Sequence, residues 1–411
     1  MGWSPVRRVM FRFGFLVAAL LVLPFPLGAI PKTDELALAL RRPLEWLVSW
    51  FATGVLGLDP LSTQQTGSGD TTASYVQHLV IGILALLGAA VWSALDRRRT
   101  AYPRLAAAAI VWLRYYLAFT LLLYAFAKLT QFPEPSAARL DQRVGDMSPM
   151  GMLWTFMGSS RPYAVFGGCA EALGGVLLLG RRTYVAGALV AIAAMSNVVA
   201  LNFCYDVPVK LLSMQLLAMA IVLFAPHARR LIRAALGRAV AEVPPRPRRS
   251  PRFERARSGA KAMLIALMGI TLYAMVDQVL GMLPPRHELC GIWDADRFVL
   301  DGTERPPLLT DVERWHKVYF SGVSLSVRPP GDGPLVRFPA KVDPAQRAIR
   351  LKLKDGEAIW TYALSTEGHR TSLVLDGAYR GKPFHAELHR EPEPLLLTRG
   401  FHWINELPYA P

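Results

Sequence analysis

Apolar and polar positions follow two different patterns along this 411-residue chain. Up to about residue 283, apolar residues form runs close to the roughly 20 residues that a helix needs to cross a bilayer. They predict seven spans, over about residues 9–30, 74–95, 105–129, 162–180, 183–203, 207–225 and 260–283. From residue 284 the runs give way to short alternating segments. The chain is therefore predicted to be a polytopic α-helical membrane protein with a C-terminal antiparallel β domain.

The alternating segments have the period of two that is typical of strands with one buried face. Eight strands are predicted: Ile292–Leu300, Val318–Val327, Leu335–Val342, Ala348–Lys354, Ile359–Ser365, Thr371–Leu375, Pro383–Arg390 and Leu395–Phe401. Short connections favour an antiparallel meander that closes into a small barrel. Gly291-Ile292-Trp293 resembles the Gly-x-Trp at the start of lipocalin-like barrels. The interior is either a filled structural core or a ligand cavity.

Two further segments lie between the predicted spans. Glu35–Leu58 has the leucine and tryptophan spacing of an amphipathic helix, and such a helix is expected to lie in the membrane interface. The loop Gln131–Pro162 is rich in aromatic residues and methionine. This loop is predicted to be either a cap packed over the outer mouth of the helices or an ordinary interfacial aromatic belt.

The net charge of +15 is concentrated at alternate ends of the predicted spans. Basic residues gather at Arg7, Arg8 and Arg12, at Arg97–Arg99, at Arg181 and Arg182, and from Arg229 to Lys261. Because Lys- and Arg-rich short loops stay in the cytoplasm, the N-terminus is expected inside and the β domain outside a bacterial inner membrane. A cleaved signal peptide is the alternative for the first span.

The most basic segment is the run from Arg229 to Lys261, with ten Arg and one Lys against two Glu, a net charge of +9. Its prolines favour an extended linker, and its charge suits the anionic headgroups of the inner leaflet. A topology anchor explains this run better than nucleic-acid binding does. The predicted organisation is two spans with an interfacial helix between them (1–100), a four-helix bundle (101–228), a basic cytoplasmic linker (229–259), a last span (260–283) and a periplasmic β domain (284–411).

Ionisable residues inside the central spans are the main candidates for a binding site. A charged side chain in the hydrocarbon region is retained mainly where it forms an ion pair or has a function. The third span places its polar residues at steps of three and four, on one helical face. Depth along the spans predicts two ion pairs, Arg114 with Glu171 and Lys128 with Asp206. Such pairs either form a ligand site or only lock the helix register. The ligand-binding candidates are Arg114, Tyr124, Lys128, Glu171, Asn197, Asn202 and Asp206.

The same region carries a resemblance to a known family. The residues Arg114-Tyr115-Tyr116, Tyr124 to Lys128, Glu171-Ala172-Leu173-Gly174-Gly175 and Leu179 to Arg182 resemble the DoxX-like family of small four-helix membrane proteins, over about residues 105–225. The resemblance implies a four-helix bundle in a membrane. For members associated with thiosulfate or quinol oxidation, it also implies a link to quinone chemistry. This chain departs from the family by its additional spans and its β domain.

The histidines and cysteines of the chain limit which redox cofactors it could bind. Haem would require axial ligands within spans, yet His78 is the only histidine there. A quinone or a lipid headgroup needs only a few polar groups and an apolar slot. No Cys-x-x-Cys occurs, which excludes a dithiol centre, and Cys204 and Cys290 are either bridged or isolated thiols.

A metal site is not expected. On one predicted strand His385, Glu387 and His389 share a face and have the ligand types that zinc prefers. Their apolar neighbours are expected to point into the barrel, which would leave these three residues in solvent as no more than weak metal candidates.

Three functions remain open from the sequence. The first is a redox accessory protein that binds a quinone or lipid at the polar face of the bundle. The second is a membrane-anchored binding or assembly protein that acts on a periplasmic protein partner through its β domain. A small-solute transporter is a weaker alternative, because no inverted repeat is apparent. No motif decides whether the protein is an enzyme.

Overall fold

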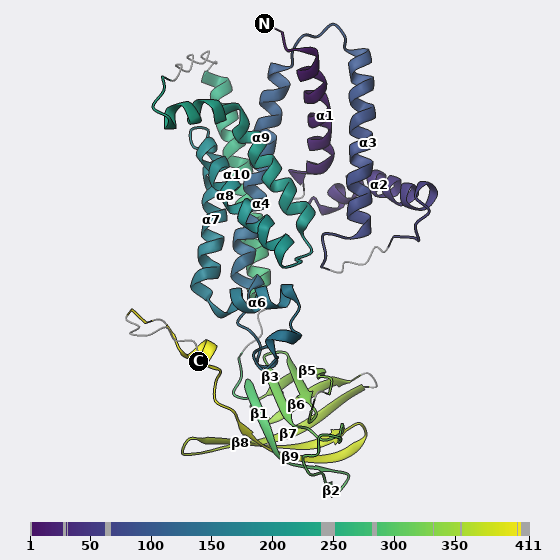
Figure 1. Ribbon diagram of the computed structural model, residues 1–411, viewed down its shortest axis with the longest axis vertical. Coiled ribbons are helices and arrows are strands. Elements are labelled where there is room, and N and C mark those ends of the chain that lie inside the picture. Colours follow the sequence, from purple (N-terminus) through teal and green to yellow (C-terminus); the bar gives the residue numbers. More distant parts are fainter. Residues whose placement is uncertain are drawn as a thin grey trace. The chain divides into compact units, whose positions relative to one another are not determined.

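The computed structural model describes residues 2–27, 30, 32–61, 67–239, 251–281, 286–331, 333–353, 356–400 and 402–403. The chain divides into two compact units, each drawn in Figure 1. The helical unit consists of Met1–Gln131 and Pro162–Gly281. The β unit consists of Phe132–Arg161 and Met282–Pro411. The predicted loop between the third and fourth spans therefore belongs to the β unit.

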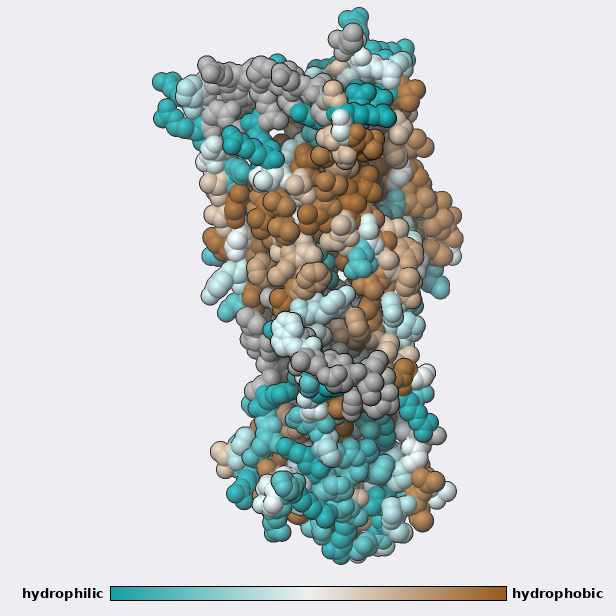
Figure 2. Space-filling model, turned by 60° about the vertical axis from the view of Figure 1, so that its left-hand side comes forward, coloured by the Kyte–Doolittle hydropathy of each residue, from teal (hydrophilic) through white to brown (hydrophobic). Residues whose placement is uncertain are grey.

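Within the described residues, six helices of the helical unit are long and apolar enough to cross a membrane. They lie in α3 (Thr72–Leu95), α4 (Pro103–Gln131), α7 (Arg161–Leu179), α8 (Tyr184–Cys204), α9 (Lys210–Ala235) and α10 (Pro251–Gly281). Figure 2 shows hydrophobic residues gathered over the helical unit on the face that is drawn. Large apolar side chains of the helical unit, such as Leu86 and Phe166, are more than half exposed. This surface suits lipid, and it confirms a multi-pass membrane protein.

The predicted first span over residues 9–30 is not among these six helices. Its helix, α1 (Pro5–Val22), ends after 18 residues, before Pro24 and Pro26, which cannot continue a helix. The helix carries three arginines, and Arg12 is only 3% exposed. Its guanidinium donates to the Tyr102 hydroxyl, to Ser93 Oγ at 2.7 Å and to the Asp96 carbonyl at 2.9 Å. These contacts fasten α1 alongside α3 (Figure 1), and they explain how the charged side chain of Arg12 can be buried.

The basic linker predicted over 229–259 is helical at both ends, and its described residues 236–239 are not helical. The helix α9 continues through the basic residues to Ala235, and α10 already begins at Pro251. Residues 240–250 of this prediction lie outside the described residues.

The amphipathic helix predicted over Glu35–Leu58 is confirmed as α2 (Asp34–Trp50), followed by one π-helical turn (Phe51–Val55). Val48 and Ala52 pack against Val76 and Val80 of α3. Several large apolar side chains on the rest of this helix are exposed: Leu36, Leu38, Leu40, Trp46 and Trp50.

The β unit contains the predicted barrel. Its strands are β1 (Gly291–Leu300), β2 (Thr303–Glu304), β3 (Lys317–Ser321), β4 (Ser324–Arg328), β5 (Val336–Asp343), β6 (Ala348–Leu353), β7 (Gly356–Glu367), β8 (Arg370–Tyr379) and β9 (Lys382–Arg390). The two residues of β2 pair antiparallel with the last two residues of β1. From β3 to β9 each strand pairs antiparallel with the next. The pairing of β1 with β9, for example Ala295 with Leu388, closes the sheet into a barrel of eight strands.

Two predicted strands differ from the structure. The segment Val318–Val327 contains a hairpin, in which β3 and β4 are joined by a two-residue turn. In the segment predicted as Leu395–Phe401, the described residues 395–400 are not a strand, and the first four form the short helix α11 (Leu395–Thr398), whereas residue 401 lies outside the described residues. Because β9 already pairs with β1, the closed sheet leaves this segment no free edge.

The barrel interior is filled by aromatic side chains. The ring centroid of Trp315 lies 4.7 Å from the ring centroid of Phe384 and 5.4 Å from that of Trp360. Trp293, in the Gly-x-Trp sequence, is fully buried, and its Nε1 donates to the Leu289 carbonyl at 2.8 Å. The guanidinium of Arg390 lies 4.7 Å from the Trp293 ring centroid. Of the two interiors that the sequence left open, the structure contains the filled core.

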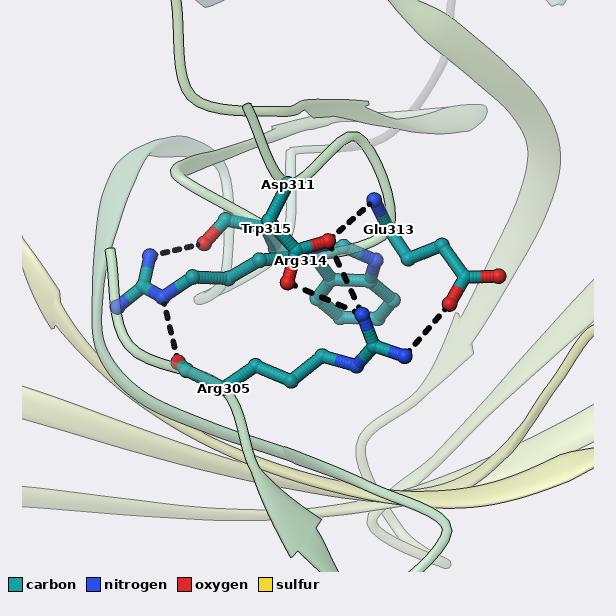
Figure 3. A network of polar contacts seen from close by, with 5 residues as sticks. All are labelled: Arg305, Asp311, Glu313, Arg314 and Trp315. Carbon is teal, nitrogen blue, oxygen red and sulfur yellow. Dashed lines mark hydrogen bonds and ion pairs between the residues drawn. The ribbon is translucent and has the colours of Figure 1, made fainter. Parts of the chain in front are cut away.

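A buried arginine ties the β2–β3 connection to the barrel wall (Figure 3). Arg314 is 2% exposed and donates to the carbonyls of Arg305, Trp315 and Ala295. Arg305 in turn pairs with Asp311 at 3.0 Å and with Glu313 at 2.7 Å. Every carboxylate in this network therefore faces a guanidinium or a backbone N–H group.

Candidate functional site

Lys128 and Glu171 form an ion pair between α4 and α7, with Lys128 Nζ 3.2 Å from Glu171 Oε1. The two helices approach closely because glycines line their contact. A Cβ atom on Gly168 would lie 2.9 Å from the Ala125 carbonyl oxygen, and one on Gly175 would lie 2.9 Å from Leu122 Cγ. Glu171 is only 3% exposed. Small residues on one helix thus bury the carboxylate beside a lysine of the other.

The predicted pair of Arg114 with Glu171 is wrong, and the helix register explains the error. Gly168 faces Ala125, whereas Gly175, two turns later, faces Ala118. Arg114 therefore lies beyond Glu171, toward the C-terminal end of α7. The prediction placed both residues near the middle of their helices and therefore at the same depth. The helices differ in length, with 29 residues in α4 and 19 in α7, so their midpoints do not lie side by side.

Arg114 instead belongs to a second polar cluster, between α4, α8 and α9. Its guanidinium carbon lies 5.0 Å from the Tyr115 ring centroid and 5.5 Å from that of Tyr184, distances at which a cation is attracted by a ring face. The Tyr184 hydroxyl hydrogen-bonds His227 Nε2 at 2.6 Å. Arg114 is 7% exposed, and its Nε has no hydrogen-bond partner among the described residues.

The predicted pair of Lys128 with Asp206 is also wrong. Asp206, whose side chain is 81% exposed, lies 2.7 Å from the ammonium group of Lys210. Sequence reasoning missed Asp70, which accepts hydrogen bonds from the backbone N–H groups of Lys210 and Leu211 and so caps α9. Asp70 immediately precedes α3, but Thr71 caps that helix by accepting from the Ser74 N–H. A local signal would thus have assigned Asp70 to the wrong helix.

The remaining candidates lie in different surroundings. Tyr124 is half-buried on α4, one turn before Lys128. Asn202 is buried, and its side-chain amide donates to the Val209 carbonyl at 3.4 Å. Asn197 is exposed on the surface of α8, so it does not join the interior group. The structure thus brings together Lys128 and Glu171, with Tyr124 a turn away on the face of Lys128.

The Lys128–Glu171 pair has one open bonding position. Glu171 Oε2 is buried and has no hydrogen-bond partner among the described residues. Buried carboxylate oxygens are nearly always hydrogen-bonded, so an unpaired one requires an explanation. The pair can therefore offer a ligand one acceptor, at the carboxylate, beside the positive charge of the lysine.

The weak metal candidates are held by ion pairs on the outside of the barrel. As predicted, the alternating neighbours Phe384, Ala386 and Leu388 are buried. The polar residues pair with side chains of adjacent strands: His385 with Asp376 at 2.7 Å, Glu387 with Arg297 at 3.2 Å and His389 with Asp296 at 2.9 Å. The described part of the chain contains no group of three or more His, Cys, Asp or Glu residues placed to hold a metal ion.

The cysteines Cys169, Cys204 and Cys290 are free thiols in the structure, and Cys204 and Cys290 belong to different units. Burial acts to raise the pKa of the Cys290 thiol, but interactions with His287 and the charge of Arg286 outweigh it and lower that pKa.

A polar cluster in the β unit was not found by sequence reasoning. Asp141, just after the short helix α5 (Ala137–Leu140), accepts from the Tyr319 hydroxyl at 2.6 Å, Lys317 Nζ at 3.1 Å and Arg328 Nη1 at 3.2 Å. Burial and the Asp141 carboxylate both raise the pKa of Tyr319. These contacts hold the segment 132–161 against β3 and β4. A single acid in a loop carries no local sign of such partners.

Two cavities lie between the segment 132–161 and the barrel wall. One has a volume of about 190 Å³ and is lined by residues that include Arg139, Ser324 and Arg337. The other has a volume of about 650 Å³ and lies beside Asp141, Lys317 and Arg328.

The fold defines a class of protein: a multi-pass helical membrane protein with a C-terminal antiparallel β-barrel. The chain is 36% identical over 112 residues to the uncharacterized protein YwoB of Bacillus subtilis (strain 168). The alignment covers 27% of this chain and 71% of that protein. The chain therefore belongs to the same family as YwoB. No family model matches the chain, and no solved structure matches it.

Proposed function

We propose that the protein is a DoxX-like redox accessory protein whose helical unit binds the polar head of a quinone or lipid at Lys128 and Glu171. The observation that carries this proposal is the buried Glu171 Oε2 atom, which has no hydrogen-bond partner among the described residues. A carboxylate in the hydrocarbon region is costly, and such residues usually mark a site. A carboxylate oxygen that can accept a hydrogen bond from a ligand, next to a lysine, would explain why this unfavourable burial is retained.

The chemistry of the pair suits both forms of a quinone. The ammonium group of Lys128 would donate to a quinone carbonyl, whereas the free oxygen of Glu171 would accept from a quinol hydroxyl. Tyr124, one turn before Lys128, would add a phenol hydroxyl on the same face of α4. These side chains would bind the headgroup and select it by their hydrogen bonds.

The proposed location is a bacterial inner membrane with the N-terminus in the cytoplasm. The Trp3 backbone N–H donates to the Thr100 carbonyl, and Arg8 donates to the Arg99 carbonyl. The basic residues in the first turns of α1 and those after α3 therefore share one end of the helical unit. Lys and Arg in short loops favour the cytoplasmic side. Because α10 begins at that end, the chain would leave the opposite, periplasmic face to form the β unit.

The test is mass spectrometry of small molecules that co-purify with the full-length protein in mild detergent. We expect a near-stoichiometric quinone or specific lipid with the wild type and its loss from Glu171→Gln. Asp206→Asn is the matched control, since it also converts a lysine-paired acid to an amide but at an exposed position. This control should retain the molecule.

Two results would contradict the proposal. One is the same small-molecule content in all three folded proteins. The other is bulk phospholipid alone in the wild type. Either result would favour the alternative of a membrane-anchored binding protein that acts through its β unit.

A further inference from the structure

We infer that the β unit contains a binding pocket for a small oxyanion, such as a phosphate or carboxylate group. The pocket is the cavity of about 190 Å³ between the segment 132–161 and the outer wall of the barrel. The segment contributes Ser136, Arg139 and Gln142, and the barrel contributes Ser321, Ser324 and Arg337 among its polar lining. This site is separate from the proposed ligand site in the helical unit.

The strand register explains why polar groups collect on this wall. In the β3–β4 hairpin Ser321 pairs with Ser324, and across β4 and β5 Ser326 pairs with Arg337. Side chains alternate between the two faces of a strand. Phe320, Leu325 and Val327 belong to the barrel core, so the serines between them face outward. Ser324 and Ser326 are nevertheless only 6% and 5% exposed, which means that outward-facing hydroxyls are covered here.

The charges in this cavity are unbalanced. Arg139 donates through Nη1 to the side-chain oxygen of Gln142 at 3.0 Å, and Arg337 donates through Nε to Ser324 Oγ at 3.1 Å. Neither guanidinium forms an ion pair with an acid in the described part of the chain, and no described residue that lines the cavity is acidic. In the neighbouring cavity, by contrast, Lys317 and Arg328 both form ion pairs with Asp141, and Lys317 also pairs with Glu391.

Two arginines and several hydroxyls select for an anion. A guanidinium presents paired N–H donors that match the oxygens of a carboxylate or phosphate, and serine hydroxyls donate to the remaining oxygens. The cavity is smaller than the roughly 300–1,000 Å³ of pockets for drug-sized ligands. It therefore suits a small oxyanion, either free or as the headgroup of an anionic lipid.

The first experiment measures binding of inorganic phosphate to the full-length protein in an uncharged detergent, by calorimetry at constant ionic strength. We expect saturable binding to the wild type and an affinity at least tenfold lower for Arg337→Gln and for Arg139→Gln. Arg350→Gln is the matched control, because Arg350 is exposed on β6 and donates only to Gln346. This control and Glu171→Gln should bind as the wild type does, which keeps the test independent of the proposed quinone or lipid site.

A second arm distinguishes the two sources of the anion. The protein is placed in phosphatidylcholine nanodiscs with or without phosphatidylglycerol, and retained lipid is measured by native mass spectrometry. Phosphate binding without phosphatidylglycerol would assign a soluble anion. Retention of phosphatidylglycerol that requires both Arg139 and Arg337 would assign a lipid headgroup. The inference is overturned if neither anion depends on these arginines, or if Arg350→Gln weakens binding equally.

Discussion

Glu171 in the helical unit and the partly buried Asp141 and Asp311 in the β unit differ in how completely their carboxylates are hydrogen-bonded. In the β unit Asp141 accepts from three side chains, and Asp311 accepts from Arg305 and from two backbone N–H groups. In the helical unit Glu171 pairs with Lys128 through one oxygen and leaves the other open. Asp294 Oδ1 in the β unit also lacks a hydrogen-bond partner among the described residues, so the open oxygen of Glu171 supports the proposed ligand site mainly because it lies on a membrane-spanning helix.

The difference is not a general property of the helical unit. Arg12 is as deeply buried as Glu171, yet its guanidinium has three acceptors, from Ser93, Asp96 and Tyr102. The unit can therefore hydrogen-bond a buried charge fully, as it does where Arg12 joins α1 to its neighbours. Arg114 Nε and Glu171 Oε2 are the buried charged atoms without a hydrogen-bond partner among the described residues of the spans, and the proposed binding role concerns the second of them.

The largest effect is expected when the saturated cluster of the β unit is broken. Asp141→Ala leaves Lys317 and Arg328 without this partner, and loss of one member of a buried pair costs several kcal/mol. Because these side chains are partly exposed, we expect a loss of about 2–3 kcal/mol in unfolding free energy. Hydrogen exchange should rise first across residues 132–161. Unchanged exchange in that segment would show that Asp141 does not hold it.

A smaller effect is expected from a double substitution in the helical unit. Lys128→Met combined with Glu171→Gln removes both charges of the pair. Replacing a buried ion pair by uncharged residues often changes the unfolding free energy little. We therefore expect an unfolding free energy within about 1 kcal/mol of the wild type. The same protein should still lack the co-purified molecule. A large loss of stability in the double variant would instead make the pair a structural element.

The smallest effect is expected from an exposed ion pair on the barrel. The hydrogen bond with Asp376 raises the pKa of His385 above its ordinary value of 6.5. Its stabilisation is therefore complete below pH 6.5 and is lost as pH rises through the higher pKa of the folded state. The pair is exposed, so the change should stay below about 1 kcal/mol.

Chemical denaturation between pH 5 and pH 9 measures this effect. The pH dependence of stability should become smaller in His385→Gln, by the part that His385 contributes, and stay unchanged in His369→Gln, a control at an exposed histidine. An identical pH profile for His385→Gln and the wild type would exclude the contribution of His385.

The architecture was largely predictable because hydrophobic periodicity is a local property. Apolar runs such as residues 74–95 and 183–203 predicted spans that the structure contains as α3 and α8. Alternation placed His385 and Glu387 outward and Leu388 inward, as found. The N-terminal span was overestimated because the apolar run continues past Pro24, although the helix does not.

What the sequence determined by itself is therefore the class of the protein: a helical membrane region, a closed antiparallel barrel and the residues whose burial as charges is unusual. Only the tertiary structure decided which of these residues meet. It placed Glu171 beside Lys128, Arg114 beside Tyr184, Asp70 at the start of α9 and the segment 132–161 on the barrel. Transfer of an apolar run into lipid depends on the run alone, whereas an ion pair depends on the relative register of two helices. That register is set by close contacts such as those of Gly168 and Gly175, which no hydropathy pattern encodes.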